Sequence, residues 1–155
     1  GEDTVFFTTN CGMQEPLIRS VFENHGIYTL QCCPSPFHAF PAALNIDMGG
    51  HEADVEYMME QLQAKVDEYG MNGRVSTWGV PCNMLFVNAG VEYAKKVLEG
   101  QTSGVLDEEV LRATIQECAE QYSPDAQMTI DYYVDDNGTA KENHFLVMSD
   151  FVTFE

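Results

Sequence analysis

Residues 4–33 read TVFFTTNCGMQEPLIRSVFENHGIYTLQCC and hold a complete strand–helix–strand unit. The short apolar run at 4–9 predicts a strand buried on both faces. Pro16 suits a first helical turn, where its missing N–H has no partner to lose, and Gly26 ends the helix. A second strand at 27–33 follows at once. Such a unit defaults to a right-handed crossover and a parallel strand pair, so we predict an α/β fold with a Rossmann-like parallel sheet and flanking helices.

The rest of the chain continues the alternation and then changes. Residues 34–50 form a long loop with three prolines and a closing Gly-Gly, and loops of that length are often functional. Further elements are predicted as a helix at 52–69, a strand at 74–79, a helix at 84–99, a helix after Asp107, and two strands at 128–134 and 144–154. Asn137-Gly138 predicts a hairpin between the last two strands. Residues 1–80 therefore form a βαβαβ core, and 81–155 add helices and a C-terminal β-hairpin.

Charge limits the classes of partner. The 155 residues carry 25 acids and seven bases, a formal net charge of -18, and a sequence pI near 4.2. A polyanion of this kind is repelled by phosphate backbones and by anionic membranes, so no nucleic-acid partner is expected. No apolar run reaches the roughly 20 residues needed to cross a bilayer.

Cysteine usage gives no disulfide or metal motif. The five cysteines are odd in number and irregular in spacing, without any C-x-x-C: Cys11, Cys32, Cys33, Cys82 and Cys118. This is a poor disulfide framework and a poor zinc signature, which suggests a reducing or anaerobic setting. The sequence predicts no metal site and no cofactor.

Ligands of open α/β sheets sit at the carboxyl ends of strands. Three strand ends are therefore candidate positions, at 10–12, 32–36 and 78–83. Asn10 could reach a ligand or simply cap the following turn. Trp78 could stack on a ring-bearing ligand or fill the core.

The Cys32-Cys33 pair admits several hypotheses. A thiol nucleophile would need His38 or His51 as its base. A metal site would use both thiols and both histidines, without a recognised spacing. A vicinal disulfide would be strained. Because nothing in the sequence places a histidine beside a thiol, we favour one cysteine packed inward and its neighbour facing the ligand side.

Four stretches together resemble one family. They are DTVFFTTNCGMQEP (3–16), QCCPSPFHAFPAAL (31–44), GRVSTWG (73–79) and YYVDDNGTAKENHFLV (132–147). In this order they are similar to the C-terminal half of an uncharacterised bacterial lipoprotein family with the type 1 periplasmic-binding-protein fold. The Gln-Cys-Cys-Pro-Ser-Pro block at 31–36 is the most specific element of the resemblance.

The resemblance implies a larger protein than residues 1–155. Relatives have about twice this length and two lobes that enclose a ligand, so the chain would be a single, incomplete lobe that lacks the N-terminal lobe and one βα unit. Residues 79–83 would lie at a hinge crossing. The export signal and lipid anchor would lie upstream, which implies an extracytoplasmic, membrane-anchored lipoprotein. An ABC permease would be its partner. Uncovered apolar surface should then lead the fragment to self-associate.

The leading hypothesis is therefore a non-catalytic, small-solute-binding lobe of an ABC-transporter-type receptor. The expected ligand contacts are Asn10, Cys11, Gln31, Cys33, Ser35 and Trp78. One alternative is a cysteine-dependent enzyme that uses Cys32 or Cys33 with His38. Another is an effector-binding sensor domain of the same fold.

Overall fold

The computed structural model describes residues 2–155, apart from the side chain of Asn143. It contains helices and strands in the order expected of an α/β chain. Their bounds are β1 (Val5–Phe6), η1 (Cys11–Met13), α1 (Gln14–Glu23), β2 (Ile27–Tyr28), α2 (Phe40–Leu44), α3 (Val55–Tyr69), β3 (Ser76–Trp78), α4 (Cys82–Leu98), α5 (Glu108–Glu120), β4 (Met128–Val134), β5 (Ala140–Ser149) and β6 (Phe151–Thr153). The predicted α/β class is confirmed.

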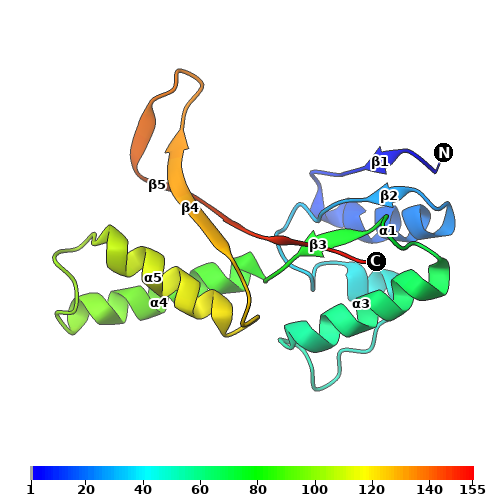
Figure 1. The fold of residues 1–155 in the computed structure, drawn as a ribbon, viewed down its shortest axis with the longest axis horizontal. Coiled ribbons are helices and arrows are strands. Elements are labelled where there is room, and N and C mark those ends of the chain that lie inside the picture. The colour runs from blue at the N-terminus through cyan, green and yellow to red at the C-terminus, as the bar shows by residue number, and fades with distance from the viewer. Residues whose placement is uncertain (1) are drawn as a thin grey trace.

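The first part of the molecule is a small sheet with helices packed against it (Figure 1). Strands β1 and β2 pair in parallel, and a bridge from Tyr28 to Val75 continues the parallel alignment toward β3. α1 and α3 contact each other, since the rings of Phe22 and Tyr69 meet edge-on with centroids 5.5 Å apart. One apolar core, centred on residues such as Phe22, Tyr28 and Leu62, holds these elements together.

The first strand is not buried on both faces, which corrects the sequence-based prediction. β1 spans only two residues, and Val5 and Phe7 remain 57% and 56% exposed. Val5 and Phe6 are neighbours in the strand and point to opposite faces. Because both are exposed, neither face of β1 is fully covered.

The second part is built from α4, α5 and the β4–β5 hairpin, which projects from the molecule in Figure 1. Its separate apolar core contains Leu85, Ile115 and Ile130. Lys96 of α4 also donates to Thr114 Oγ1 of α5 at 2.9 Å. The predicted hairpin is present, with its turn at 135–138.

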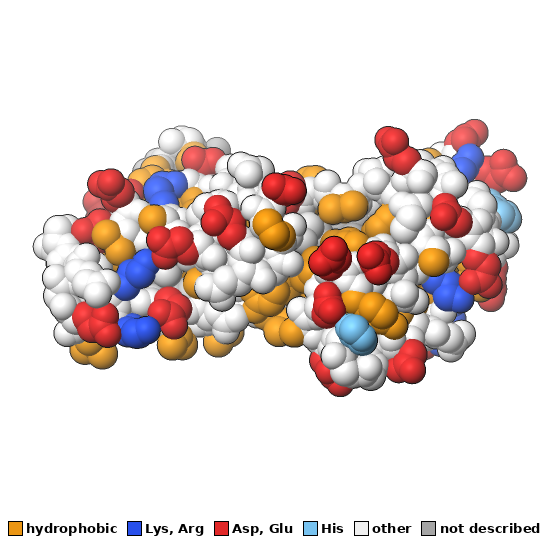
Figure 2. Space-filling model, turned by 60° about the horizontal axis from the view of Figure 1, so that its bottom comes forward, with side chains coloured by type: hydrophobic (Ala, Val, Ile, Leu, Met, Phe, Trp, Pro, Cys, Tyr) orange, Lys and Arg blue, Asp and Glu red, His pale blue; other side chains and the backbone are white. Residues whose placement is uncertain are grey.

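Two chain segments join the two parts. The first runs from β3 into α4, and the second runs from β5 through Asp150 into β6. They lie side by side, because β3 and β6 pair antiparallel and the Gly79 N–H donates to Asp150 O at 3.0 Å. The single strand predicted at 144–154 is therefore two strands, one in each part. Figure 2 shows the resulting waist, where hydrophobic side chains gather between two rounded parts.

Helix boundaries follow local capping chemistry. Asp54 and Asp107 cap α3 and α5, each accepting a hydrogen bond from a backbone N–H of the first turn. α3 ends at Gly70, which adopts a left-handed φ of 65°. Within the described residues, no helix combines the length and apolar character needed to cross a membrane.

Candidate functional site

Three thiols and one imidazole converge at the carboxyl ends of β1 and β2. Cys11 begins the short helix after β1, Cys32 and Cys33 follow β2, and His38 lies in the next loop. The four potential ligand atoms all lie within 4.8 Å of one another. Cys11 Sγ is 2.8 Å from Cys33 Sγ and 3.5 Å from Cys32 Sγ. Parallel neighbouring strands end at the same edge of a sheet, which explains why residues 21 positions apart meet here.

Local turns orient these side chains toward one another. Asn10 accepts from the Gly12 N–H at 2.9 Å and so starts the turn that carries Cys11. Ser35 Oγ accepts from the Phe37 N–H, and the His38 N–H donates to Ser35 O at 3.1 Å. Pro34 and Pro36 flank Ser35 and restrict this loop. The two turns bring Cys11 and His38 to the strand end that carries the Cys32-Cys33 pair.

A buried chain of hydrogen bonds runs from Tyr28 through Gln14 to the Cys32 thiol. Tyr28 OH donates to Gln14 Oε1 at 2.6 Å, and this orients the Gln14 amide so that its N–H group can act as a donor. A hydrogen bond from Gln14 lowers the pKa of the Cys32 thiol, with smaller contributions from Cys11 and Cys33. The Cys32 sulfur therefore becomes a thiolate more readily than an ordinary cysteine.

Cys11 has the opposite electrostatic environment. Its hydrogen bonds with Cys33 and Cys32 raise the pKa of its thiol to about 12. Cys11 therefore keeps its proton and can donate it in a hydrogen bond to the sulfur of Cys33 or Cys32.

Two polar atoms beside the cluster are buried without a hydrogen-bond partner among the described residues, His38 Nε2 and Gln31 Nε2. Buried polar atoms are normally satisfied, and each exception calls for an explanation such as an ion or a catalytic role. His38 is itself a member of the cluster, so one of these two residues belongs to the site.

Three residues predicted to contact a ligand are wholly or partly buried. Gln31 is 1% exposed, and its Oε1 accepts from Thr77 at 3.0 Å. Trp78 Nε1 donates to Gln31 O, and the Trp78 ring meets Phe151 edge-on. Ser35 is also buried. In this conformation these three side chains support the strand ends, and their role as ligand contacts stays a prediction.

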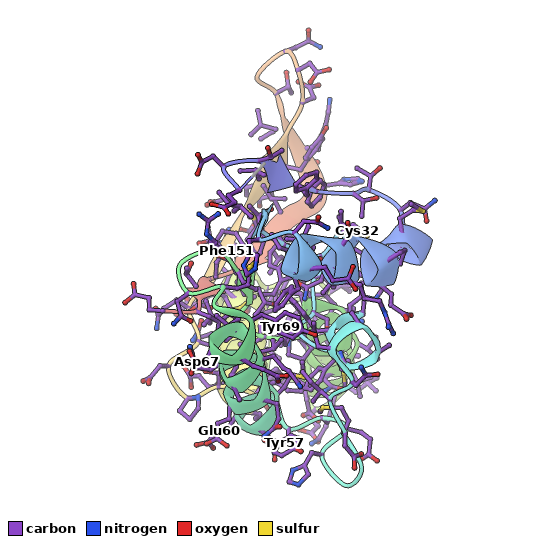
Figure 3. The ribbon with its side chains drawn as sticks, turned by 90° about the vertical axis from the view of Figure 1, so that its right-hand side faces the viewer. Cys32, Tyr57, Glu60, Asp67, Tyr69 and Phe151 are labelled. Atoms are coloured by element: carbon purple, nitrogen blue, oxygen red, sulfur yellow. The ribbon has the colours of Figure 1, made fainter. Side chains whose placement is uncertain are left out.

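The structure separates the two histidines that the sequence allowed beside the thiols. His51 stacks on Tyr57 with ring centroids 3.9 Å apart and pairs with Asp54 at 3.0 Å. Tyr57 lies far from Cys32 in Figure 3. The metal-ligand set considered from the sequence, which included His51, is therefore wrong. The cluster in the structure contains Cys11 and does not contain His51.

Cys11 could have been found from the sequence. It follows the first predicted strand, and Cys32 and Cys33 follow the second, so a parallel pair of strands already implied that they would be neighbours. The remaining cysteines, Cys82 and Cys118, are buried elsewhere, and all five are free thiols in the structure. No vicinal disulfide forms between Cys32 and Cys33.

A second feature lies where the two parts meet. A cavity of about 410 Å³ is lined by the start of α3, by the loop after α5 and by the crossing segments. Glu56, Asp125 and Asp150 contribute carboxylates, whereas Val55 and Met59 contribute apolar surface. Both parts of the molecule therefore line this cavity, and three of its lining residues are acidic.

Known proteins resemble the chain over two stretches and in its fold. Residues 1–76 match a family described as proteins of unknown function, DUF3798, and residues 87–154 match a second family model that carries no description. No curated protein matches the chain significantly.

A solved structure has a similar fold over almost the whole of this chain. It is a crystal structure from Clostridium difficile 630, described as a candidate transcriptional regulator, with a TM-score of 0.74 and 16% sequence identity. The similarity covers 99% of this chain and 42% of that one, so the chain spans well under half the length of its structural neighbour. The chain thus resembles uncharacterised families in sequence and has an α/β fold that recurs within a longer bacterial protein.

Proposed function

We propose that the chain is the C-terminal portion of a two-lobed receptor that encloses a small solute between its lobes. The proposed full-length protein is an extracytoplasmic lipoprotein with the type 1 periplasmic-binding-protein fold that delivers its solute to an ABC permease. The resemblance of four sequence stretches supports the lipoprotein and transporter assignments.

The division of the molecule at the double crossing carries this proposal. Two separate apolar cores are joined through two adjacent segments, at Gly79 and at Asp150. Parts that pack internally and share a narrow connection can rotate about it, which is how hinged receptors close around a ligand. In both parts the chain also leaves apolar surface uncovered, as at Phe7 of the first part and at Val91 and Leu98 of α4. A longer protein could cover both surfaces.

Charge favours one class of solute. The cavity at the junction carries three carboxylates, and the whole chain has a net charge of -18. An anionic solute would be repelled there, whereas an amine-bearing or neutral one would not. We therefore propose a small neutral or amine-bearing ligand.

Two other functions remain as alternatives with specific support. The structural neighbour's description favours an effector-binding sensor, in which ligand closure would be reported to a DNA-binding domain outside these residues. The proximity of His38 to Cys32 favours a thiol enzyme more than the sequence alone does. In the structure, however, His38 lies among three competing sulfurs and its Nε2 atom has no orienting partner among the described residues.

The test uses the full-length protein and a panel of amino acids, polyamines, nucleosides and monosaccharides. A bound member should raise the melting temperature and also reduce the radius of gyration in small-angle X-ray scattering, because closure compacts two lobes. Turnover of the bound compound that is lost in a Cys32→Ser, Cys33→Ser variant would contradict a receptor and favour the enzyme. Solute-dependent binding to DNA would favour the sensor.

A further inference from the structure

We propose that Cys11, Cys32, Cys33 and His38 together bind one tetrahedral divalent ion that prefers thiolate ligands, and that Zn²⁺ is the ion that fits. The sequence alone predicted no metal site. The proposal does not depend on which solute the receptor takes, because its evidence lies in the cluster itself.

The first argument is geometric. Zinc binds sulfur at roughly 2.3 Å and imidazole nitrogen at roughly 2.0–2.1 Å, so two ligands of one ion lie about 3.5–3.8 Å apart in a tetrahedron. The four donor atoms here lie within 4.8 Å of one another, and two of the sulfur pairs are 2.8 and 3.5 Å apart. Adjustments of side-chain torsions alone are of the size needed to seat the ion.

The second argument is the chemistry of the donor set. Three thiolates and one imidazole form one of the common structural zinc sites, and soft thiolate ligands select zinc over magnesium or calcium. Four protein ligands also fill a tetrahedral shell and leave no position for water. The site is therefore suited to hold structure together rather than to activate a substrate.

An unpaired imidazole nitrogen gives the third argument, and it is independent of the sulfurs. His38 Nε2 is buried and has no hydrogen-bond partner among the described residues. In a neutral imidazole one ring nitrogen carries a hydrogen and the other a lone pair, so Nε2 can bind a metal ion in the tautomer that is protonated at Nδ1. A metal ion would satisfy it, whereas a cluster of thiols without metal leaves the nitrogen's desolvation uncompensated.

A buried amide, that of Gln14, lies beside the cluster as a second-sphere group. Gln14 is fully buried, its Oε1 accepts from Tyr28 OH, and its Nε2 donates to Thr8 O at 3.2 Å. The same side chain hydrogen-bonds to the Cys32 sulfur. Second-sphere donors of this kind orient ligands and tune the affinity of a metal site.

The ion would fasten two loops to each other. Cys11 belongs to the loop after β1, and the other three ligands belong to the loop after β2. These loops form the carboxyl edge of the sheet that faces the second part, where the Cys82 N–H donates to Pro34 O at 2.8 Å. Metal binding would thus order the edge that borders the proposed hinge.

The experiment measures metal rather than solute. Full-length protein is purified anaerobically under reducing conditions, and its zinc content is determined by mass spectrometry of the elements. We expect one zinc per chain. After removal of zinc, added Co²⁺ should give thiolate-to-cobalt charge-transfer bands and the d–d bands of a tetrahedral site. Cys33→Ser and His38→Ala should each weaken Co²⁺ binding by at least about 100-fold, more than loss of a second-sphere partner causes.

Cys118→Ser is the matched control, because Cys118 is a buried free cysteine in the other apolar core. It should leave both the zinc content and the cobalt spectrum unchanged. Circular dichroism checks that each variant remains folded. Reduced protein without zinc or cobalt binding would overturn the proposal. So would a cobalt spectrum that survives Cys33→Ser, or a purified protein in which Cys11 is linked to Cys33 by a disulfide and no metal is present.

Discussion

A single buried hydroxyl, that of Tyr28, organises the polar chemistry beneath the cluster. The side chain is 1% exposed, and burial raises the pKa of its phenol above the usual range. Its hydroxyl therefore stays protonated and donates to Gln14 Oε1. The orientation of the Gln14 amide, and hence its hydrogen bond to Cys32, depends on this one donor.

Tyr28→Phe should destabilise the protein by about 1–2 kcal/mol, because it leaves the buried Gln14 Oε1 without a donor. Urea unfolding measures the loss. Tyr57→Phe is the matched control, since Tyr57 OH donates to Asp47 O on an exposed surface where water can replace it. An equal loss in both variants would contradict the role given to the buried hydroxyl.

At this scale the sequence reveals residue types but not their neighbours. The two strand ends could be predicted, and with them the position of the cysteines. Asn10, however, serves the turn by capping it, and Gln31 is turned inward by Thr77. These outcomes depend on side-chain directions at the ends of very short strands. No periodicity in the sequence encodes those directions.

Helix ends are the elements that the sequence predicts best. The helix predicted after Asp107 begins at Glu108, and the Asp107 carboxylate accepts from the Ser103 and Val110 N–H groups. These hydrogen bonds, those from Ser103 first, lower the pKa of Asp107. Because capping rests on a few adjacent residues, local chemistry decides it before tertiary contacts form.

The lowered pKa predicts a pH dependence. A carboxyl whose folded pKa lies below its unfolded value, about 3.9, contributes stability above that value and loses it as pH falls through the folded pKa. Asp107→Asn keeps a capping oxygen without the charge. Its unfolding free energy should therefore fall less between neutral and acidic pH than that of the parent protein, as followed by urea unfolding at several pH values. Asp131→Asn, on an exposed position of β4, serves as the control, and an equal flattening there would contradict the assignment.

The crossing segments are the elements that the sequence describes least well. A Cβ at Gly79 would lie 2.5 Å from Asp150 Oδ1 and 3.3 Å from Asp150 O. Gly79→Ala should therefore destabilise the protein by about 1–3 kcal/mol through overpacking.

Gly90 lies within α4, and a Cβ added there would meet no other atom within 4 Å, so Gly90→Ala should stabilise by roughly 0.5–1 kcal/mol.

Thermal or urea unfolding of both glycine variants gives the comparison. Asp150→Ala in the Gly79→Ala background should recover part of the loss, because it removes the closest clashing atom. Opposite signs for the two glycines are the expected outcome. A neutral Gly79→Ala would show that the two crossing segments are not held as closely as the structure has them.

Strand boundaries could not be predicted for a physical reason. The runs at 4–9 and 27–33 look like longer strands, yet only two residues of each enter the ladder. β6 pairs with β3 across more than seventy residues. Strand formation depends on partners elsewhere in the chain, and local propensity cannot supply them.

Across the whole molecule, the two cores explain the shape. One contains residues from the first 75 positions together with Phe154, and the other contains residues 80–130. Acidic side chains are scattered over both rounded parts, and hydrophobic side chains gather at the waist with acidic ones beside them (Figure 2). The sequence predicted a single, incomplete lobe with a hinge crossing at 79–83. The structure adds a second crossing at Asp150, where the chain returns to the first part.

Native-state hydrogen exchange on residues 1–155 tests this division most directly, with one core variant in each part. Leu62 and Leu85 are both fully buried, and Leu→Ala in a core costs about 2–5 kcal/mol. Leu62→Ala should accelerate exchange in α1 and α3 and leave α4 and α5 protected, whereas Leu85→Ala should do the reverse. If either variant accelerates exchange equally in all four helices, the molecule is a single cooperative unit, and the description of two hinged parts is wrong.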